Sequence, residues 1–198
     1  DGKRGAVMAL STYGEIKTAV ASWLVRTDLT TVIPDFVALA EADIRRDVRV
    51  QNMEQIATGT LTSETLAFPT RYLETRSLYV GTSLYEYVTP ARYQDLANSQ
   101  AKVFTIIGEN IYVLTGTGAY ELIYWQAYAA FSADADTNWL LTNHPDIYLA
   151  GACKHASSYL MDQTNEARFA GRYEAAVSRA NSLDKLKSVG GQLRARAL

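Results

Sequence analysis

The chain has 198 residues, of which 48% are hydrophobic and 20% are charged, and its formal net charge at neutral pH is −2. These proportions are typical of a globular protein, and a chain of this length buries roughly 70% of the surface that it exposes when unfolded. A net charge so close to zero excludes a broad basic field that would draw the protein to nucleic acid. We therefore expect one domain, or one domain that carries an insertion.

Residues 8–50 predict a pair of helices. Thr12 and Glu15 match a capping box at the start of the first helix, and apolar residues then recur at helical spacing up to about Arg26. Pro34 suits the first turn of a second helix, because the amide hydrogen that proline lacks has no helical partner there.

The middle of the chain, residues 53–130, predicts β-structure. It is rich in Thr, Tyr, Val and Ile and has turn residues at short intervals. Residues 108–110 (Gly-Glu-Asn) predict a tight hairpin, and Pro90 to Ala97 predict a short helix within this segment. No long helix separates the strands, so we expect an inserted antiparallel β domain built as a meander. The expected strands are Gln55–Leu61, Thr65–Phe68, Glu74–Val80, Tyr85–Val88, Val103–Ile107, Ile111–Leu114 and Tyr120–Tyr128.

Residues 138–187 predict a return to helices. A helix from about Pro145 to Met161 is apolar on nearly every side, which indicates burial in a core or between subunits. A last helix is expected from about Thr164 to Leu186, and we expect residues 188–198 to form a flexible basic tail. The predicted fold class is therefore α+β, in which a helical bundle from both ends of the chain carries the inserted β domain.

Tyrosine accounts for 13 of the 198 residues. Its ring buries a large apolar area while its hydroxyl remains available to a partner, which favours contacts between subunits. Strands also favour tyrosine, so both interpretations of this composition stay open.

No pattern of residues predicts catalysis. The loop from Thr115 to Gly118 contains glycine, but a strand follows it, whereas a dinucleotide-binding loop opens a helix. Cys153 is the only cysteine and lies in an apolar helical pattern, so we expect a buried thiol. His144, His155 and Cys153 lack the spacing of a zinc site. We therefore expect no enzymatic activity, no metal ion and no cofactor, and no apolar stretch approaches the roughly 20 residues of a membrane span.

Three stretches of the chain resemble the head-to-tail adaptor (connector) proteins of tailed bacteriophages, especially the podovirus-like phages with short, non-contractile tails. The stretches are Met8–Leu24 with Ile33–Arg46, Leu66–Leu78, and Asn138–Leu149. The resemblance implies a helical bundle with an inserted β domain. It also implies a structural virion protein that is made in the host cytoplasm and assembles at the head-to-tail interface as a homo-oligomeric ring, usually a dodecamer.

The resemblance further implies the partners of such a ring. It would bind the portal protein on one side and the tail nozzle or tube on the other, and genomic DNA would pass through its lumen without specific binding. The C-terminal segment of these adaptors commonly docks against the portal. The candidate portal-docking residues are therefore Lys185, Lys187, Arg194 and Arg196, whose cationic groups suit charge-assisted contacts with acidic surface.

Two other interpretations remain. One is a different neck or tail component of a phage, although the order of helices, β segment and helices argues against it. The other is a carbohydrate-binding module in which Trp125 and Trp139 stack on sugar rings. That function would need several aromatic rings exposed on one concave face.

Overall fold

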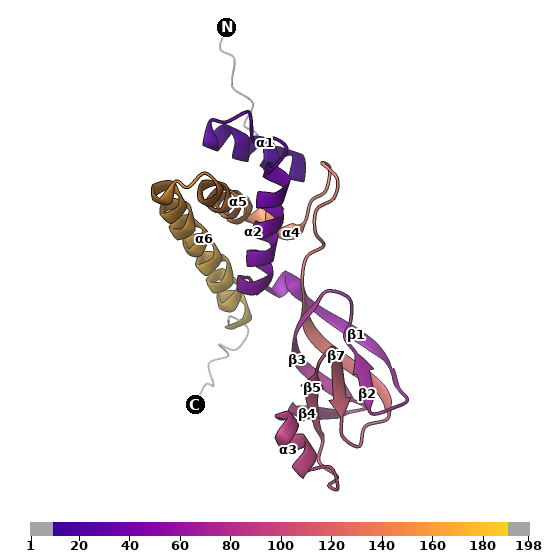
Figure 1. The fold of residues 1–198 in the computed structure, drawn as a ribbon. Coiled ribbons are helices and arrows are strands. Elements are labelled where there is room, and N and C mark those ends of the chain that lie inside the picture. The colour runs from indigo at the N-terminus through magenta and orange to yellow at the C-terminus, as the bar shows by residue number, and fades with distance from the viewer. Residues whose placement is uncertain (1–9, 190–198) are drawn as a thin grey trace, which may run out of the picture. The chain divides into compact units, whose positions relative to one another are not determined.

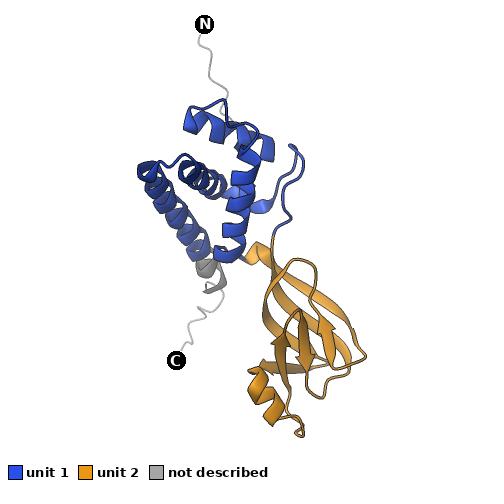
Figure 2. Ribbon diagram, in the orientation of Figure 1, with its two compact units in different colours: residues 1–50, 128–198 blue, residues 51–127 orange. Residues whose placement is uncertain are grey.

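The chain forms two compact units, each of which is described by itself. The structure is a computed structural model that describes residues 10–189, with the side chains of residues 10–183. One unit is helical and combines the residues up to Val50 with those from Tyr128 onward; the other holds residues 51–127 and all the strands (Figure 2). The chain therefore passes between the units twice. The α+β class expected from the sequence is confirmed.

The helical unit begins with the predicted capping box. The Thr12 hydroxyl accepts a hydrogen bond from the Glu15 amide at 3.3 Å, and the Glu15 carboxylate accepts one from the Thr12 amide at 3.0 Å. The helix ends at Leu24 because Val25 adopts a left-handed conformation with φ of 52°, which a β-branched residue rarely takes. The helices of this unit (Figure 1) are α1 Tyr13–Leu24, α2 Ile33–Asp47, α4 Trp139–Asn143, α5 Pro145–Tyr159 and α6 Gln163–Val189.

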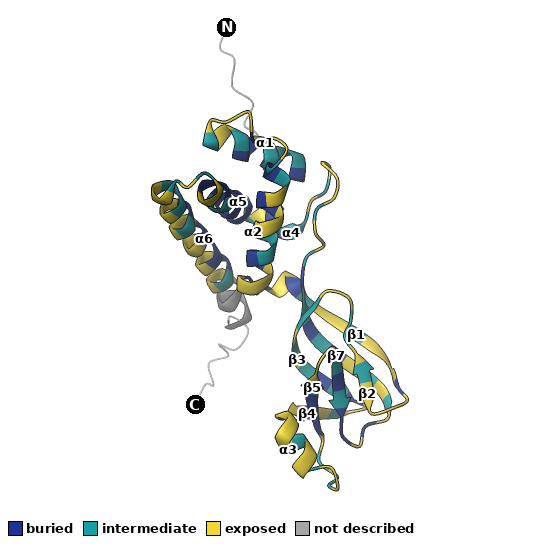
Figure 3. Ribbon diagram, in the orientation of Figure 1, coloured by how far each residue is buried: buried dark blue, intermediate teal, exposed yellow. Residues whose placement is uncertain are grey.

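Helix α5 is the centre of the helical unit. Helices α1, α2 and α6 all pack against it, and it is buried along most of its length (Figure 3). Gly151 permits the closest approach, because a Cβ there would lie 3.0 Å from the Cβ of Ala40 on α2 and 3.4 Å from the Tyr173 ring on α6. The prediction of a helix that is apolar on nearly every side is confirmed, and its neighbours within the chain explain that burial.

Polar contacts join the C-terminal end of α2 to α6. The Tyr173 hydroxyl donates a hydrogen bond to the Asp47 carboxylate at 3.0 Å. The Asn181 amide group donates to the backbone carbonyl of Asp47 and accepts from the amide of Arg49, each at 3.0 Å. The end of α2 leaves backbone groups without helical partners, and a side chain of α6 satisfies two of them.

The β unit contains one sheet in the strand order β1-β7-β3-β4-β5-β6-β2. The expectation of a purely antiparallel meander is wrong. Strand β7 lies between β1 and β3, and β4 pairs with β5 in parallel, in the register Glu86 to Val103 and Tyr87 to Phe104. The elements are a 3-10 helix at Gln51–Met53, β1 Glu54–Leu61, β2 Thr65–Ala67, β3 Tyr72–Val80, β4 Ser83–Tyr87, α3 Pro90–Asp95, β5 Val103–Ile107, β6 Asn110–Val113 and β7 Gly118–Gln126.

The physical reason for the parallel pair is the connection that contains α3. A tight turn reverses the chain, whereas a longer connection carries it back so that the next strand starts at the same end of the sheet. The next connection, between β5 and β6, is the tight hairpin that the sequence predicts. Ile107 pairs with Asn110, and Gly108 takes a positive φ of 61°, a conformation that glycine adopts without steric cost.

A small apolar core fills the β unit. Leu78 of β3, Ile111 of β6 and Leu122 of β7 are fully buried in it. On the edge strand β1, Gly59 pairs with Tyr120 of β7, and the Tyr120 ring covers it so closely that a Cβ would approach to 2.8 Å. A cross-strand aromatic ring thus shields an edge position that has no side chain of its own.

Two glycines of the helical unit provide a matched test of α5 packing. Gly151→Val should lower the free energy of unfolding by about 1–3 kcal/mol, because the added atoms meet the side chains of Ala40 and Tyr173. Gly171→Ala should instead raise it by up to about 1 kcal/mol, because nothing lies within 4 Å of that position and alanine favours helix. Urea unfolding of both variants measures these changes. Equal effects of the two substitutions would contradict the close approach at Gly151.

Candidate partner-docking surface

The side chains that the structure describes do not assemble a chemical centre. Among them, no group of three His, Cys, Asp or Glu residues could hold a metal ion. Cys153 is buried, and its burial raises the pKa of the thiol to about 12, which keeps it protonated and unreactive. His144 abuts the start of α5 but makes no side-chain capping bond there. No helix in the described part of the chain is long and apolar enough to cross a membrane.

A hollow on the helical unit lies between α1, the start of α5 and one flank of α6. Its volume is about 640 Å³. Leu149 and Ala150 of α5 contribute apolar surface, and Gly171 and Ala175 of α6 add no bulk on the opposite wall. We call this hollow the arginine groove, because Arg168, Arg172 and Arg179 line it along α6.

The exposed side of the arginine groove is aromatic and cationic. The Trp23 side chain is 49% exposed and lies against Phe169, with 6.1 Å between the ring centroids. The Arg172 guanidinium lies 5.4 Å from the Trp23 centroid, and that of Arg168 lies 5.5 Å from the Phe169 centroid. Such cation–π contacts fix the direction of an arginine while leaving its hydrogen-bond donors available.

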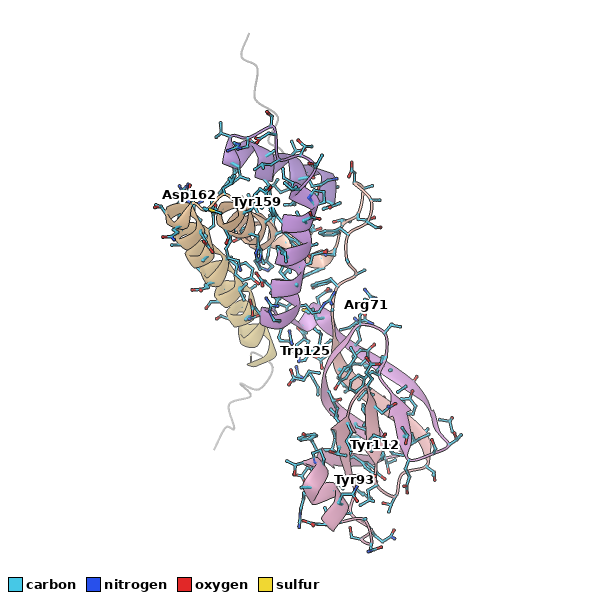
Figure 4. All side chains as sticks on the ribbon, in the orientation of Figure 1. Arg71, Tyr93, Tyr112, Trp125, Tyr159 and Asp162 are labelled. Atoms are coloured by element: carbon cyan, nitrogen blue, oxygen red, sulfur yellow. The ribbon has the colours of Figure 1, made fainter. Side chains whose placement is uncertain are left out.

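The arginines of the groove lack carboxylate partners among the described side chains. None of Arg168, Arg172 and Arg179 takes part in any of the ion pairs formed there. A second hollow, of about 440 Å³, shares Trp23, Arg168 and Arg172 with the first and extends to Asp162. Asp162 lies at the turn between α5 and α6, and the exposed Tyr159 is the last residue of α5 (Figure 4). An open surface with an aromatic residue and several unpaired arginines is the composition of a protein-binding site.

A buried ionic cluster lies elsewhere in the helical unit, around Asp43 of α2. Its carboxylate accepts hydrogen bonds from Arg46 of the same helix and from Lys154 of α5, and it contacts the His155 Nε2 atom at 2.7 Å. Lys154 also lies over the Tyr173 ring, 4.9 Å from its centroid. Burial alone would raise the pKa of Asp43, but the hydrogen bonds from Lys154 and His155 outweigh it and hold that pKa below its usual value of 3.8.

The Asp43 cluster is structural, because it joins α2 to α5 and its carboxylate is enclosed. The sequence analysis did not find it. The position of Asp43 in the sequence could have indicated that it is buried. It follows Phe36 by seven residues and lies between Ala40 and Ile44 on the buried stripe of α2. A carboxylate on such a stripe requires a cationic partner from a neighbouring helix.

The structure leaves the candidate portal-docking residues untested. Lys185 and Lys187 belong to α6, but their side chains lie outside the described set. Arg194 and Arg196 lie outside the described residues altogether. The described part of α6 does, however, place other arginines in the groove, and the sequence analysis did not single these out.

The β unit carries a third hollow, of about 570 Å³, with several aromatic rings in its lining. Phe68 and Tyr72 stack there at 3.9 Å between centroids, and the half-exposed Tyr87 packs edge-on against Phe104. Neither tryptophan proposed for sugar stacking lines this hollow. Trp125 lies on β7 (Figure 4) beneath the Arg76 guanidinium, and Trp139 belongs to the helical unit.

These features define a class of protein, an α+β chain with surfaces suited to binding other macromolecules. The model of the SU10 adaptor protein family matches residues 11–196, nearly the whole chain. The chain therefore belongs to the SU10 adaptor protein family, a family of phage structural proteins of the virion rather than of enzymes. No curated protein matches the chain. The resemblance to phage adaptors inferred from the sequence is thereby confirmed at the level of the family.

The Asp43 cluster generates a test with a defined pH dependence. Asp43→Asn should lower the free energy of unfolding at pH 7 by about 1–3 kcal/mol, because Lys154 and His155 lose their anionic acceptor. The pKa of Asp43 is lower in the folded protein than in the unfolded chain, where it is near 3.8. Its contribution is therefore complete above about pH 4 and is lost as the pH falls through the folded-state pKa.

Urea unfolding of wild type and Asp43→Asn at pH 7 and pH 3 measures this contribution. The difference between the two proteins should be largest at pH 7 and should shrink at pH 3. Asp28→Asn is the matched control, because Asp28 pairs with Arg26 on the exposed surface and its loss should change stability little. A difference that is the same at both pH values would refute the role assigned to the Asp43 carboxylate.

Proposed function

We propose that the chain is the subunit of a ring that joins the capsid portal to the tail of a phage of the short-tailed type. The ring, a dodecamer, binds the portal protein on one side and the tail nozzle or tube on the other. It is a component of the virion at the head-to-tail interface and is made in the host cytoplasm. The observation that carries the proposal is the family match over residues 11–196.

The surface chemistry supports a protein that works by binding its neighbours. The helical unit exposes the arginine groove with its half-exposed Trp23, and aromatic and arginine side chains are the residues most enriched at protein interfaces. A net charge of −2 also suits the wall of a DNA channel, because dense cationic surface would bind phosphates and hold the genome in place. The DNA thus passes through the lumen without specific binding.

The decisive experiment mixes the protein with the portal protein encoded by the same genome and images the complex by electron microscopy. A ring of added density coaxial with the portal is the expected result, and its symmetry gives the number of subunits. Portals that remain bare at saturating protein would contradict the proposal and favour a different neck or tail position.

We further propose that the basic C-terminal segment docks on the portal through Lys185, Lys187, Arg194 and Arg196. Deletion of residues 188–198 should weaken attachment to the portal, because the basic charge of Arg194 and Arg196 is lost, and we expect it to leave thermal unfolding unchanged. Co-sedimentation with the portal at increasing salt measures the loss, which should be greatest at low ionic strength.

A matched pair of variants separates charge from chain length in this experiment. The first replaces the four C-terminal cationic residues with Gln. The control replaces the four cationic residues of the β unit, which changes the net charge equally: Arg71, Arg76, Arg92 and Lys102. The C-terminal variant should lose more portal binding than the control. Unchanged co-sedimentation of the truncated protein would rule out the docking role.

The aromatic hollow of the β unit favours one second candidate, carbohydrate binding. Phe68, Tyr72 and Tyr87 contribute rings to one concave surface, as sugar stacking requires. A glycan array probed with the isolated protein tests this candidate. Binding that is lost in Tyr87→Ala would support it, and an array without signal would remove it.

A further inference from the structure

Strand β1 forms one edge of the sheet, and no strand in the described part of the chain pairs with its outer side. It has eight residues, whereas β2, at the other edge, has three. Proteins usually keep other chains from pairing with such an edge by means of a short strand, lysine, proline or a bulge. Strand β1 contains no lysine, arginine or proline, and it pairs with β7 without a register shift. The long edge is therefore unprotected.

The pairing of β7 with its two neighbours shows which backbone groups of β1 point outward. The amide of Gly81, directly after β3, donates a hydrogen bond to the carbonyl of Ala119 at 2.7 Å, so Ala119 directs its backbone groups toward β3. Residues along an antiparallel strand alternate in this respect. Because Thr60 lies opposite Ala119, the amides and carbonyls of Ile56, Thr58 and Thr60 point away from the sheet.

The side chains along this edge are open to solvent and mostly uncharged. Ile56 is 60% exposed, and Thr58 and Thr60 are exposed on the same face of the strand (Figure 3). The only charged residue of β1 is Glu54, at its first position, and it pairs with Arg76 at 3.5 Å. The edge therefore complements an extended, uncharged chain that carries an apolar or β-branched side chain to cover Ile56.

A second copy of the chain does not supply such a strand. Among the described strands, the only edge of equal length is β1 itself, and two β1 strands pair about a two-fold axis. Neighbours in a ring meet instead through two different surfaces, one on each copy. The terminal segments are also poor strand formers, because residues 1–9 and 190–198 contain one β-branched residue, Val7, and no aromatic residue.

We propose that β1 binds an extended segment of the tail nozzle or tube protein, which joins the sheet as an added strand. The backbone of this segment forms hydrogen bonds with Ile56, Thr58 and Thr60, and one of its side chains covers Ile56. Strand addition of this kind takes its affinity from main-chain hydrogen bonds. The inference rests on the proposed function, which assigns portal docking to the C-terminal segment of the helical unit and leaves the β unit to the tail.

Hydrogen exchange at single amides tests the added strand. Exchange is measured on rings assembled on the portal, before and after addition of the tail protein from the same genome. Before addition, the amides of Ile56, Thr58 and Thr60 should exchange rapidly, whereas those of Ala57 and Gly59, which face β7, should be protected. The tail protein should slow the first group by about tenfold or more and leave the second group unchanged.

Each other outcome has a distinct meaning. Protection of the three outward amides on the portal alone would overturn the assignment to the tail, because the portal or a neighbouring copy would then cover the edge. Rapid exchange that persists when the tail protein is bound would overturn the added strand and leave the adaptor function standing. Absence of a ring on the portal, or of tail protein on the ring, would refute the proposed function itself.

Substitutions at the two edges of the sheet give a second readout. Thr58→Lys places a charge at the centre of the unprotected edge and should weaken binding of the tail protein by about tenfold. Thr65→Lys is the matched control, because Thr65 is exposed on the opposite edge strand β2, and it should bind the tail protein as the wild type does.

Thr58→Pro provides a variant that adds no charge. It removes one outward amide hydrogen, and the pairing with β7 does not use that hydrogen. We expect it to weaken binding of the tail protein as Thr58→Lys does. Binding of the tail protein at wild-type strength by both Thr58 variants would overturn the proposed strand addition.

Discussion

The burial of α5 on nearly every side is the constraint on which the helical unit depends. A helix without a solvent-facing stripe needs neighbours all around it, and α1, α2 and α6 supply them from both ends of the chain. Gly151 sets how near α2 and α6 come to it. The Asp43 cluster then fixes the rotation of α2 about its own axis, because a buried carboxylate must face Lys154 and His155.

The division between groove and core follows from this arrangement. Helix α6 uses Phe169 and Tyr173 to cover α5, and its next flank is left with arginines and small residues. The same helix thus closes the core on one side and lines the arginine groove on another. Members of the adaptor family to which the chain belongs work by contact with other proteins. Such contact requires a stable core that holds a chemically distinct surface in place.

Elements with local signals could be predicted from the sequence, and pairings between distant elements could not. The capping box at Thr12 and the turn at Gly108 depend on neighbouring residues, and both are present as expected. The insertion of β7 between β1 and β3 depends on a pairing such as Glu54 with Trp125, which no local pattern encodes. The arginine groove could not be predicted for the same reason. Trp23, Leu149 and Arg172 come from three segments, and none of these segments has an unusual pattern by itself.

The double passage of the chain between its units has a consequence for the order of folding. Helix α2 must meet partners that follow it by more than a hundred residues, as the contact of Asp43 with Lys154 shows (sequence separation 111). The strands between them pair only with one another, so this segment can fold as soon as it has been synthesised. Because β1 pairs with β7, that step brings the two ends of the insertion together and shortens the loop that α2 and α5 must close. The pairing of β1 with β7 thus holds the two ends of the insertion together while the helical core forms.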